Sequence, residues 1–308
     1  MTRTAFRIRC VGLVGLAAVL AATPLAASAA PQSGQKTFAS PQAAVNALVT
    51  AIERDDEQAR LEILGPNAKR IVSSGDPVED AASRANFLQR YRQMHRLVKE
   101  PDGTTNLLIG AANWPMPIPL VSTGHAWYFD TEAGKREILY RRIGRNELSA
   151  IRVCEELAAA QKEYHALRGH YAEKLFSDAG RHNGLYWEVR AGEPRSPIGP
   201  LVASAVAAGY APGRSSVPTP YRGYYYHTLS RQGPSAPGGA RAYLVGGRMT
   251  GGFAFVAYPA GYRSSGVMTF IVSSDGVVYE KDLGKDTARI AEAMKSYDPD
   301  SSWRKTQD

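Results

Sequence analysis

The stretch from Gly251 to Gly284, GGFAFVAYPAGYRSSGVMTFIVSSDGVVYEKDLG, decides the fold of the C-terminal part of the chain. Phe253–Tyr258 and Val267–Val272 are rich in β-branched, aromatic and apolar residues, and turn residues bound both runs, as is typical of strands. Asp275 and Gly276 follow the second run, and an Asp-Gly pair supplies the positive φ that a tight hairpin needs. The stretch therefore predicts three consecutive antiparallel strands.

The first thirty residues have the pattern of a secretory signal peptide. Three arginines before position 10 precede an apolar run at Val11–Leu25, and small residues end this run near Ala29. The run is too short, and too closely followed by polar chain, to span a membrane. We therefore expect residues 1–29 to be removed, with export to the periplasm or beyond and no membrane span in the mature chain. A retained N-terminal anchor is the alternative interpretation.

The composition is that of a folded globular protein. The chain has 308 residues, 44% of them hydrophobic and 21% charged, which is enough for two domains. The formal charge of +8 includes the three arginines of the signal peptide, so the mature chain carries +5, spread along its length. This charge argues against nucleic-acid binding and allows at most a weak attraction to an anionic envelope surface. Cys10 leaves with the signal peptide, so Cys154 remains alone and no intramolecular disulfide is expected.

We expect an N-terminal α+β domain at residues 38–144. Apolar residues at helical spacing predict helices in its first half, the third of them at Ser83–Val98. Farther on, His125–Thr131 and Glu137–Ile143 flank Gly134 and predict a hairpin. Helices followed by an antiparallel sheet indicate an α+β architecture, and the order of elements is similar to that of cone-shaped cystatin-like folds.

A second α+β domain is expected at residues 145–308. Its boundary is predicted at Gly144–Asn146, where a new helix begins and continues to about Leu167. A section rich in Gly and Pro at 180–220 then precedes an aromatic strand, Tyr221–Leu229, beside the three strands described above. One long helix followed by such a meander is loosely similar to type IV pilin-like domains, although this helix begins with charged residues instead of a membrane-inserting segment.

Several further segments have a distinctive sequence. They are FASPQAAVNAL (38–48), RRIGRNELSAIRVCEELAAAQKEY (141–164), HNGLYW (182–187), SPIGPLV (196–202) and PYRGYYYHTL (220–229). Together with the Gly251–Gly284 stretch, they resemble a bacterial secreted family, the domain-of-unknown-function family 2950. The resemblance covers nearly the whole mature chain, and it implies no catalytic residue because none is assigned in that family.

The residue types that carry most enzyme chemistry do not form a recognisable motif. Common phosphate-binding, zinc-protease, thiol-redox and nucleophile-elbow motifs are missing. Cys154 and His165 would make a nucleophile and base, but eleven residues of helix place them about 16 Å apart. His165, His170 and His182 lie close in sequence, yet a spacing of five points the first two apart on a helix. We therefore predict no metal site and no cofactor, and we assign no catalytic residue.

The candidate recognition residues are mainly aromatic. Trp114–Pro119 alternates proline with large apolar side chains, and such a rigid segment can line a cleft or cover a sheet edge. Alternation along the aromatic strand would put Tyr224 and Tyr226 on one face, and Tyr225 and His227 on the other, where one face can stack a sugar or a peptide. The candidate binding residues are Trp114, His182, Tyr224, Tyr225 and His227.

Three classes of function remain open, and we favour the first. It is a non-catalytic envelope module that binds another envelope protein or a polymer. The second is a secreted hydrolase that combines His182, His227 or Cys154 with an acid distant in sequence, which predicts a cleft where a histidine meets a carboxylate. The junction around Arg141–Asn146 is the place where we expect such a cleft. The third is a pilin-like assembly subunit, which requires self-association.

Overall fold

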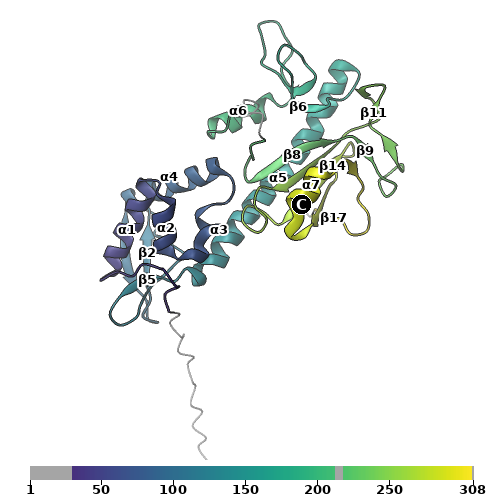
Figure 1. Cartoon of the computed structure of the whole chain (residues 1–308). Coiled ribbons are helices and arrows are strands. Elements are labelled where there is room, and N and C mark those ends of the chain that lie inside the picture. Colours follow the sequence, from purple (N-terminus) through teal and green to yellow (C-terminus); the bar gives the residue numbers. More distant parts are fainter. Residues whose placement is uncertain (1–29, 212–217, 307–308) are drawn as a thin grey trace, which may run out of the picture.

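The computed structural model describes residues 30–211 and 218–306, so the predicted signal peptide at residues 1–29 lies outside the described residues. Helices and antiparallel sheets together make up the fold, which confirms the predicted α+β class (Figure 1). The helices are α1 (Pro41–Glu53), α2 (Glu57–Leu64), α3 (Lys69–Val72), α4 (Pro77–Gln93), α5 (Thr131–Arg168), α6 (Gly199–Ala207) and α7 (Thr287–Ala293). Within the two described ranges, no helix has the length and apolar character needed to cross a membrane.

The N-terminal half forms one sheet against which α1, α2 and α4 pack. Its strands are β1 (His95–Lys99), β2 (Thr105–Ile109), β3 (Trp114–Pro115), β4 (Leu120–Ser122) and β5 (Trp127–Phe129). β2 pairs with β1, β3 and β4, and β4 pairs with β5, all antiparallel. Leu48 of α1, Leu107 of β2 and Phe129 of β5 are buried together in one core.

The predicted helix at Ser83–Val98 is wrong in its last part. α4 ends at Gln93, Met94 is extended, and the following residues form β1. Lys99 pairs with Thr105 in the register of β1 on β2, across a turn of only a few residues. The apolar spacing of this segment also suits a strand, and pairing with β2 decides between the two structures.

The hairpin predicted around Gly134, and the helix start predicted at Gly144–Asn146, are both wrong because α5 runs unbroken from Thr131 to Arg168. Asp130 caps it, accepting a hydrogen bond from the Ala133 amide at 3.3 Å. Gly134 lies in the first turn of α5 and not in a hairpin turn. Instead, the carbonyl of Pro117 lies where a Cβ would be, so the glycine permits a close approach between α5 and the preceding chain.

The C-terminal half contains the second large sheet, in the order β17-β15-β14-β13-β8. Its strands are β8 (Tyr224–Leu229), β13 (Ala254–Pro259), β14 (Met268–Ser273), β15 (Val278–Asp282) and β17 (Arg304–Lys305). The three predicted strands of the Gly251–Gly284 stretch are confirmed. The hairpin between β14 and β15 has the expected positive φ at Gly276, and Val272 faces Val278 across it. Both faces of β13 are covered, since all six residues are buried and both α5 and α7 contact the strand.

Short strands complete this half. Two three-residue strands, β6 (Lys174–Phe176) and β7 (Gly184–Tyr186), pair in parallel. The remaining short strands are β9 (Arg231–Gln232), β10 (Arg241–Ala242), β11 (Leu244–Val245), β12 (Arg248–Met249) and β16 (Ser296–Tyr297). Single turns of 3₁₀ helix lie at Pro66–Ala68 and Gly284–Asp286.

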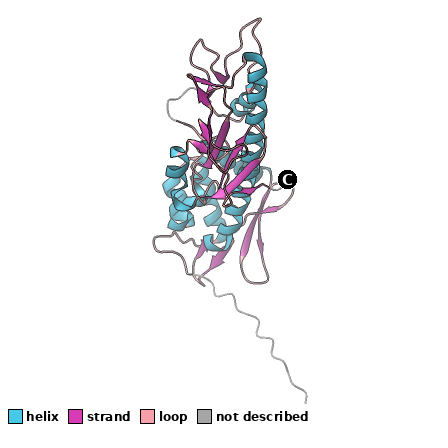
Figure 2. Ribbon diagram, turned by 90° about the vertical axis from the view of Figure 1, so that its right-hand side faces the viewer, coloured by secondary structure: helices cyan, strands magenta, loops and turns pink. Residues whose placement is uncertain are grey.

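Buried apolar residues form two clusters, one in each half, and α5 extends from the first to the second (Figures 1 and 2). Asp76, which is fully buried, links the halves. Its carboxylate caps α4 and also accepts hydrogen bonds from the Tyr210 hydroxyl and the Gly223 amide, both at 2.8 Å. Ser264 adds hydrogen bonds to the carbonyls of Arg70 and Ser73. The two halves therefore meet through polar contacts as well as through α5.

Candidate functional site

The aromatic strand β8 divides its side chains as the sequence predicts. Tyr224 is fully buried, and its hydroxyl donates to the carbonyl of Met268 at 3.0 Å. On the other face, the Tyr225 ring packs against Tyr258 with 5.4 Å between centroids. His227 also lies on that face, with Nε2 at 2.9 Å from the Ala291 carbonyl oxygen of α7. Tyr224 and Tyr225 contact other strands of the same sheet, His227 contacts α7, and none of the three lines a described pocket.

The other two candidates lie outside β8, in different halves of the chain. His182 packs on Trp187, and its Nδ1 lies 2.6 Å from a guanidinium nitrogen of Arg168 at the C-terminal end of α5. Its Nε2 is 3.6 Å from the carboxylate of Glu193. Trp114 is half-buried in β3 of the N-terminal half. The structure therefore does not bring the five predicted binding residues into one site.

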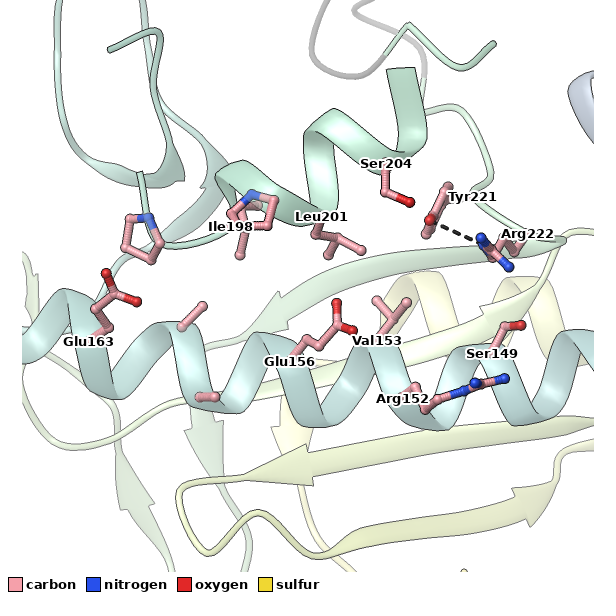
Figure 3. A pocket seen from close by; sticks show the side chains of 14 residues that line it. Ser149, Arg152, Val153, Glu156, Glu163, Ile198, Leu201, Ser204, Tyr221 and Arg222 are labelled. Carbon is pink, nitrogen blue, oxygen red and sulfur yellow. Dashed lines mark hydrogen bonds between the residues drawn. The ribbon is translucent and has the colours of Figure 1, made fainter. Parts of the chain in front are cut away.

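A groove of about 470 Å³ runs along α5 in the C-terminal half (Figure 3). One wall is α5, from Ser149 to Glu163, and α6 with the residues just before it forms the wall opposite. Pro200 occupies the first turn of α6, where a proline leaves no helical hydrogen bond unmade. Tyr221 and Arg222, which directly precede β8, close one end.

Four charged side chains line the groove, and among the described residues none of them forms an ion pair. They are Arg152, Glu156, Glu163 and Arg222. Figure 3 shows Glu163 toward one end, Arg152 and Arg222 at the other, and Glu156 between them. Charge is thus separated along the groove, with a cationic end and an anionic end.

Arg222 is held in an unusual backbone conformation at the cationic end. Its φ of 51° lies in the left-handed region, which non-glycine residues seldom adopt. Its amide donates to the Tyr210 hydroxyl at 3.1 Å, and that hydroxyl in turn donates to Asp76. Its Nε donates to the Tyr221 hydroxyl at 3.1 Å, a hydrogen bond that raises the pKa of Arg222. The junction between the halves therefore fixes the position of this guanidinium, since strained backbone persists only where its surroundings impose it.

A smaller apolar pocket of about 230 Å³ adjoins the groove beneath α6. It shares Val153, Ile198, Leu201 and Tyr221 with the groove. Tyr226, on the β8 face that points toward α5, also lines it. The Tyr226 hydroxyl is buried without a hydrogen-bond partner among the described residues. A buried hydroxyl is normally satisfied, so this one is available to a ligand that enters the pocket.

The residues proposed for a hydrolase do not meet in these pockets. Cys154 is fully buried in the core, and burial raises the pKa of its thiol far above the ordinary value, which keeps the sulfur protonated. His227 faces backbone carbonyls with both ring nitrogens. The groove, the apolar pocket beneath α6 and a third cavity in the N-terminal half have no histidine in their lining. A cavity does exist at Arg141–Arg145, where a cleft was expected, but arginines and apolar side chains line it.

Part of the groove could be recognised in the sequence. Glu156 and Glu163 fall outside the apolar stripe of the predicted helix, so their exposure follows from helical periodicity. The segments that face them are Ser196–Val202, in the Gly- and Pro-rich section, and Tyr221–Arg222, at the start of the predicted aromatic strand. Neither segment gives a local signal of where it packs. Only the tertiary structure shows that α6 lies opposite those glutamates.

Comparison with known protein families identifies one match. A family model described as Protein of unknown function (DUF2950) matches residues 35–306. The matched range contains every residue that lines the groove, and the match confirms the resemblance predicted from the sequence. No curated protein and no solved structure matches the chain.

Proposed function

The chain belongs to the DUF2950 family of proteins of unknown function, and on that premise we propose that it is a non-catalytic binding protein of the cell envelope. Its groove along α5 receives an extended peptide segment of another envelope protein. The signal-like N-terminus, with cleavage near Ala29, supports export. The two buried clusters support a division into an N-terminal and a C-terminal domain that share α5.

The separation of unpaired charges carries the proposal. A peptide end has a free carboxylate, which suits Arg152 and Arg222, because guanidinium groups bind carboxylates with two parallel hydrogen bonds. An ammonium group farther along the peptide suits Glu163. Since these side chains have no ion-pair partner among the described residues, a ligand does not have to break an ion pair there.

The dimensions of the groove agree with a short extended segment. From Ser149 to Glu163, the wall formed by α5 is about 21 Å long at roughly 1.5 Å per residue. An extended peptide advances about 3.3 Å per residue, so roughly six residues fit along it. The apolar pocket beneath α6 can hold one large side chain of the peptide, and the Tyr226 hydroxyl can donate to a peptide carbonyl.

A labelled hexapeptide tests this assignment. It carries lysine at its first position, leucine in the middle and a free C-terminal carboxylate, and fluorescence anisotropy measures its binding. Amidation of the carboxylate, or the change Arg152→Glu in the protein, is expected to weaken binding about tenfold, which is the loss of one charge-assisted contact. The variant Lys162→Glu is the matched control, because Lys162 is exposed on α5 and does not line the groove.

Charge exchange gives a stricter form of the same experiment. Glu163→Lys should weaken binding of the lysine peptide and restore binding of a peptide with glutamate at its first position. Equal binding of both peptides to both proteins would show that Glu163 does not contact the ligand. Mass spectrometry of the recovered peptide separates binding from hydrolysis, since a hydrolase releases fragments and a binding module returns the peptide intact.

A further inference from the structure

The N-terminal half contains a cavity of about 430 Å³ that is separate from the groove. It lies between α1, α2, α3, α4, the part of α5 from Ile138 to Arg145 and the β3 segment, which brings Trp114 to its lining. Apolar side chains, among them Leu48, Phe87, Met116 and Ile138, form part of the lining, and we call this part the apolar wall. The volume falls within the range of roughly 300–1,000 Å³ that is common for small-molecule sites. We call it the arginine cavity.

Six arginines line the cavity, and the carboxylates around it do not balance them. The arginines are Arg60, Arg84, Arg90, Arg141, Arg142 and Arg145. Four carboxylates pair with these arginines or line the cavity beside them. They are Asp55, Glu79, Asp80 and Glu137. Two positive charges therefore remain in excess beside an apolar wall.

The hydrogen bonds of individual arginines show where this excess lies. Arg142 donates to the backbone carbonyls of Arg70 and Ile71, each at 2.7 Å, and to no carboxylate of residues 30–211 or 218–306. Burial lowers the pKa of its guanidinium, which nevertheless stays charged at neutral pH because an arginine pKa begins above 12. Arg90 donates to the amide oxygen of Asn86 at 2.9 Å, again not to a carboxylate.

Arg60 has an unsatisfied donor. Its side chain is buried, with the residue only 6% exposed, and one terminal nitrogen lies 3.0 Å from Asp55. Its Nε is buried and has no hydrogen-bond partner among the described residues. Asp55 also pairs with Arg84 at 3.0 Å, so a single carboxylate serves two guanidinium groups. A buried charged donor without an acceptor is unfavourable, and an oxygen of a bound anion would satisfy it.

From these observations we propose that the arginine cavity binds an amphiphile with an anionic headgroup and an aliphatic tail. The headgroup, a carboxylate or a phosphate, accepts hydrogen bonds from Arg60 and Arg90, and the tail lies against the apolar wall. A free inorganic anion would leave that wall in contact with water, and a neutral hydrocarbon would leave the guanidinium groups unpaired. An anionic amphiphile would pair with the guanidinium groups through its headgroup and cover the apolar wall with its tail.

Isothermal titration calorimetry with dodecanoate and with dodecyl phosphate, each below its micelle concentration, tests this site. Binding of either is expected at one molecule per chain, and the two arms distinguish a fatty acid from a phosphate headgroup. Dodecyltrimethylammonium has the same tail with a cationic head and should not bind in the cavity. Equal heats from all three compounds, or no saturable binding of either anion, would overturn the proposal.

Variants on one helix locate the bound headgroup. Arg90→Gln removes a guanidinium from the cavity and should weaken dodecanoate binding about tenfold. Arg92→Gln is the matched control, because Arg92 lies two residues away on α4, pairs with Glu53 and does not line the cavity. Arg60→Met should have a larger effect than Arg90→Gln, and circular dichroism shows whether that variant still folds. If Arg90→Gln and Arg92→Gln bind dodecanoate equally, the headgroup does not lie at these arginines.

Discussion

The arginine cavity and the groove lie along the same helix but carry charge in opposite ways. In the cavity, six guanidinium groups face an apolar wall, and several of them share carboxylates or bond to backbone carbonyls. In the groove, charges of both signs lie apart and unpaired among the described residues. An excess of positive charge beside apolar side chains fits an amphiphile, whereas separated charges of both signs along a groove fit a peptide with two charged ends.

The two sites take arginines from neighbouring turns of one helix. Arg141, Arg142 and Arg145 belong to the cavity, and Arg152 lies only two turns farther along α5. What differs is the packing partner, which is the N-terminal helices and β3 in the first case and α6 in the second. The junction at Asp76 lies between the two sites and supports both.

The largest effect is expected from removing the carboxylate at this junction. Asp76→Ala leaves the buried Tyr210 hydroxyl and Gly223 amide without an acceptor, and it uncaps α4. We expect a loss of about 3 kcal/mol in the free energy of unfolding, measured with urea. Peptide and dodecanoate binding should both weaken, because Tyr210 positions Arg222 and α4 forms a wall of the cavity.

Asp102→Ala is the control for that measurement. Asp102 is exposed, and its side chain accepts hydrogen bonds from its near neighbour Thr104, so its removal should leave both sites and the unfolding transition nearly unchanged. Similar losses for Asp76→Ala and Asp102→Ala would mean that the buried carboxylate does not join the halves.

A pair of glycines in α5 gives the next largest effect and tests whether the helix is continuous. Gly134→Ala puts a methyl group against the carbonyl of Pro117, beside the cavity, and should destabilise the chain by about 2 kcal/mol. Gly144→Ala meets no atom within 4 Å and should stabilise it by roughly 0.5–1 kcal/mol, since alanine favours a helix interior. Thermal unfolding of both variants measures the difference. Destabilisation by Gly144→Ala would indicate a break in α5 at the predicted domain boundary.

Alkaline pH should weaken the C-terminal half through its buried tyrosines. Burial raises the pKa of Tyr243 and Tyr258 to about 12, above the ordinary value of 10. Below pH 10 both residues are protonated in the folded and the unfolded chain, so their contribution to stability is complete. Between pH 10 and 12 only the unfolded chain ionises them, and stability falls. Tyrosinate absorbance and circular dichroism, followed together, should show these groups ionising above pH 10, and a native titration with every midpoint at 10 would contradict their burial.

Thiol labelling of the unchanged chain tests the hydrolase alternative, and here we expect the smallest effect. The high pKa and burial of Cys154 predict that a thiol reagent at pH 8 labels it only when the chain unfolds. The rate of labelling should therefore rise with urea along the unfolding transition. Rapid labelling of the native chain would place the thiol in an open site and revive its role as a nucleophile.

The sequence predicts best those features that depend on local chemistry. The strands of Gly251–Gly284 and the faces of β8 follow from alternation and from the Asp-Gly turn, and both are confirmed. Gly134 misled the prediction because it resembles a turn residue, while its actual role is a close approach to Pro117. That contact depends on where Pro117 packs in the tertiary structure, so no local sequence pattern reveals it.

The candidate sites were harder to predict for the same reason. Trp114 was identified as a possible cleft residue and does line a cavity, but its arginine neighbours come from α2, α4 and α5. Arg222 lies inside the aromatic segment that was singled out, yet its left-handed conformation depends on Tyr210 and the junction. Individual residues could thus be proposed from the sequence, whereas their assembly into sites required the packing of distant segments.

The most direct measurement compares the binding of two ligands to two variants. The lysine hexapeptide and dodecanoate are each titrated into Arg152→Glu, which alters the groove, and into Arg90→Gln, which alters the cavity. We predict that Arg152→Glu loses about tenfold in affinity for the peptide alone, and that Arg90→Gln loses about tenfold for dodecanoate alone. If either variant weakens both ligands equally, or neither, then the two regions are not separate sites for a peptide and an anionic amphiphile.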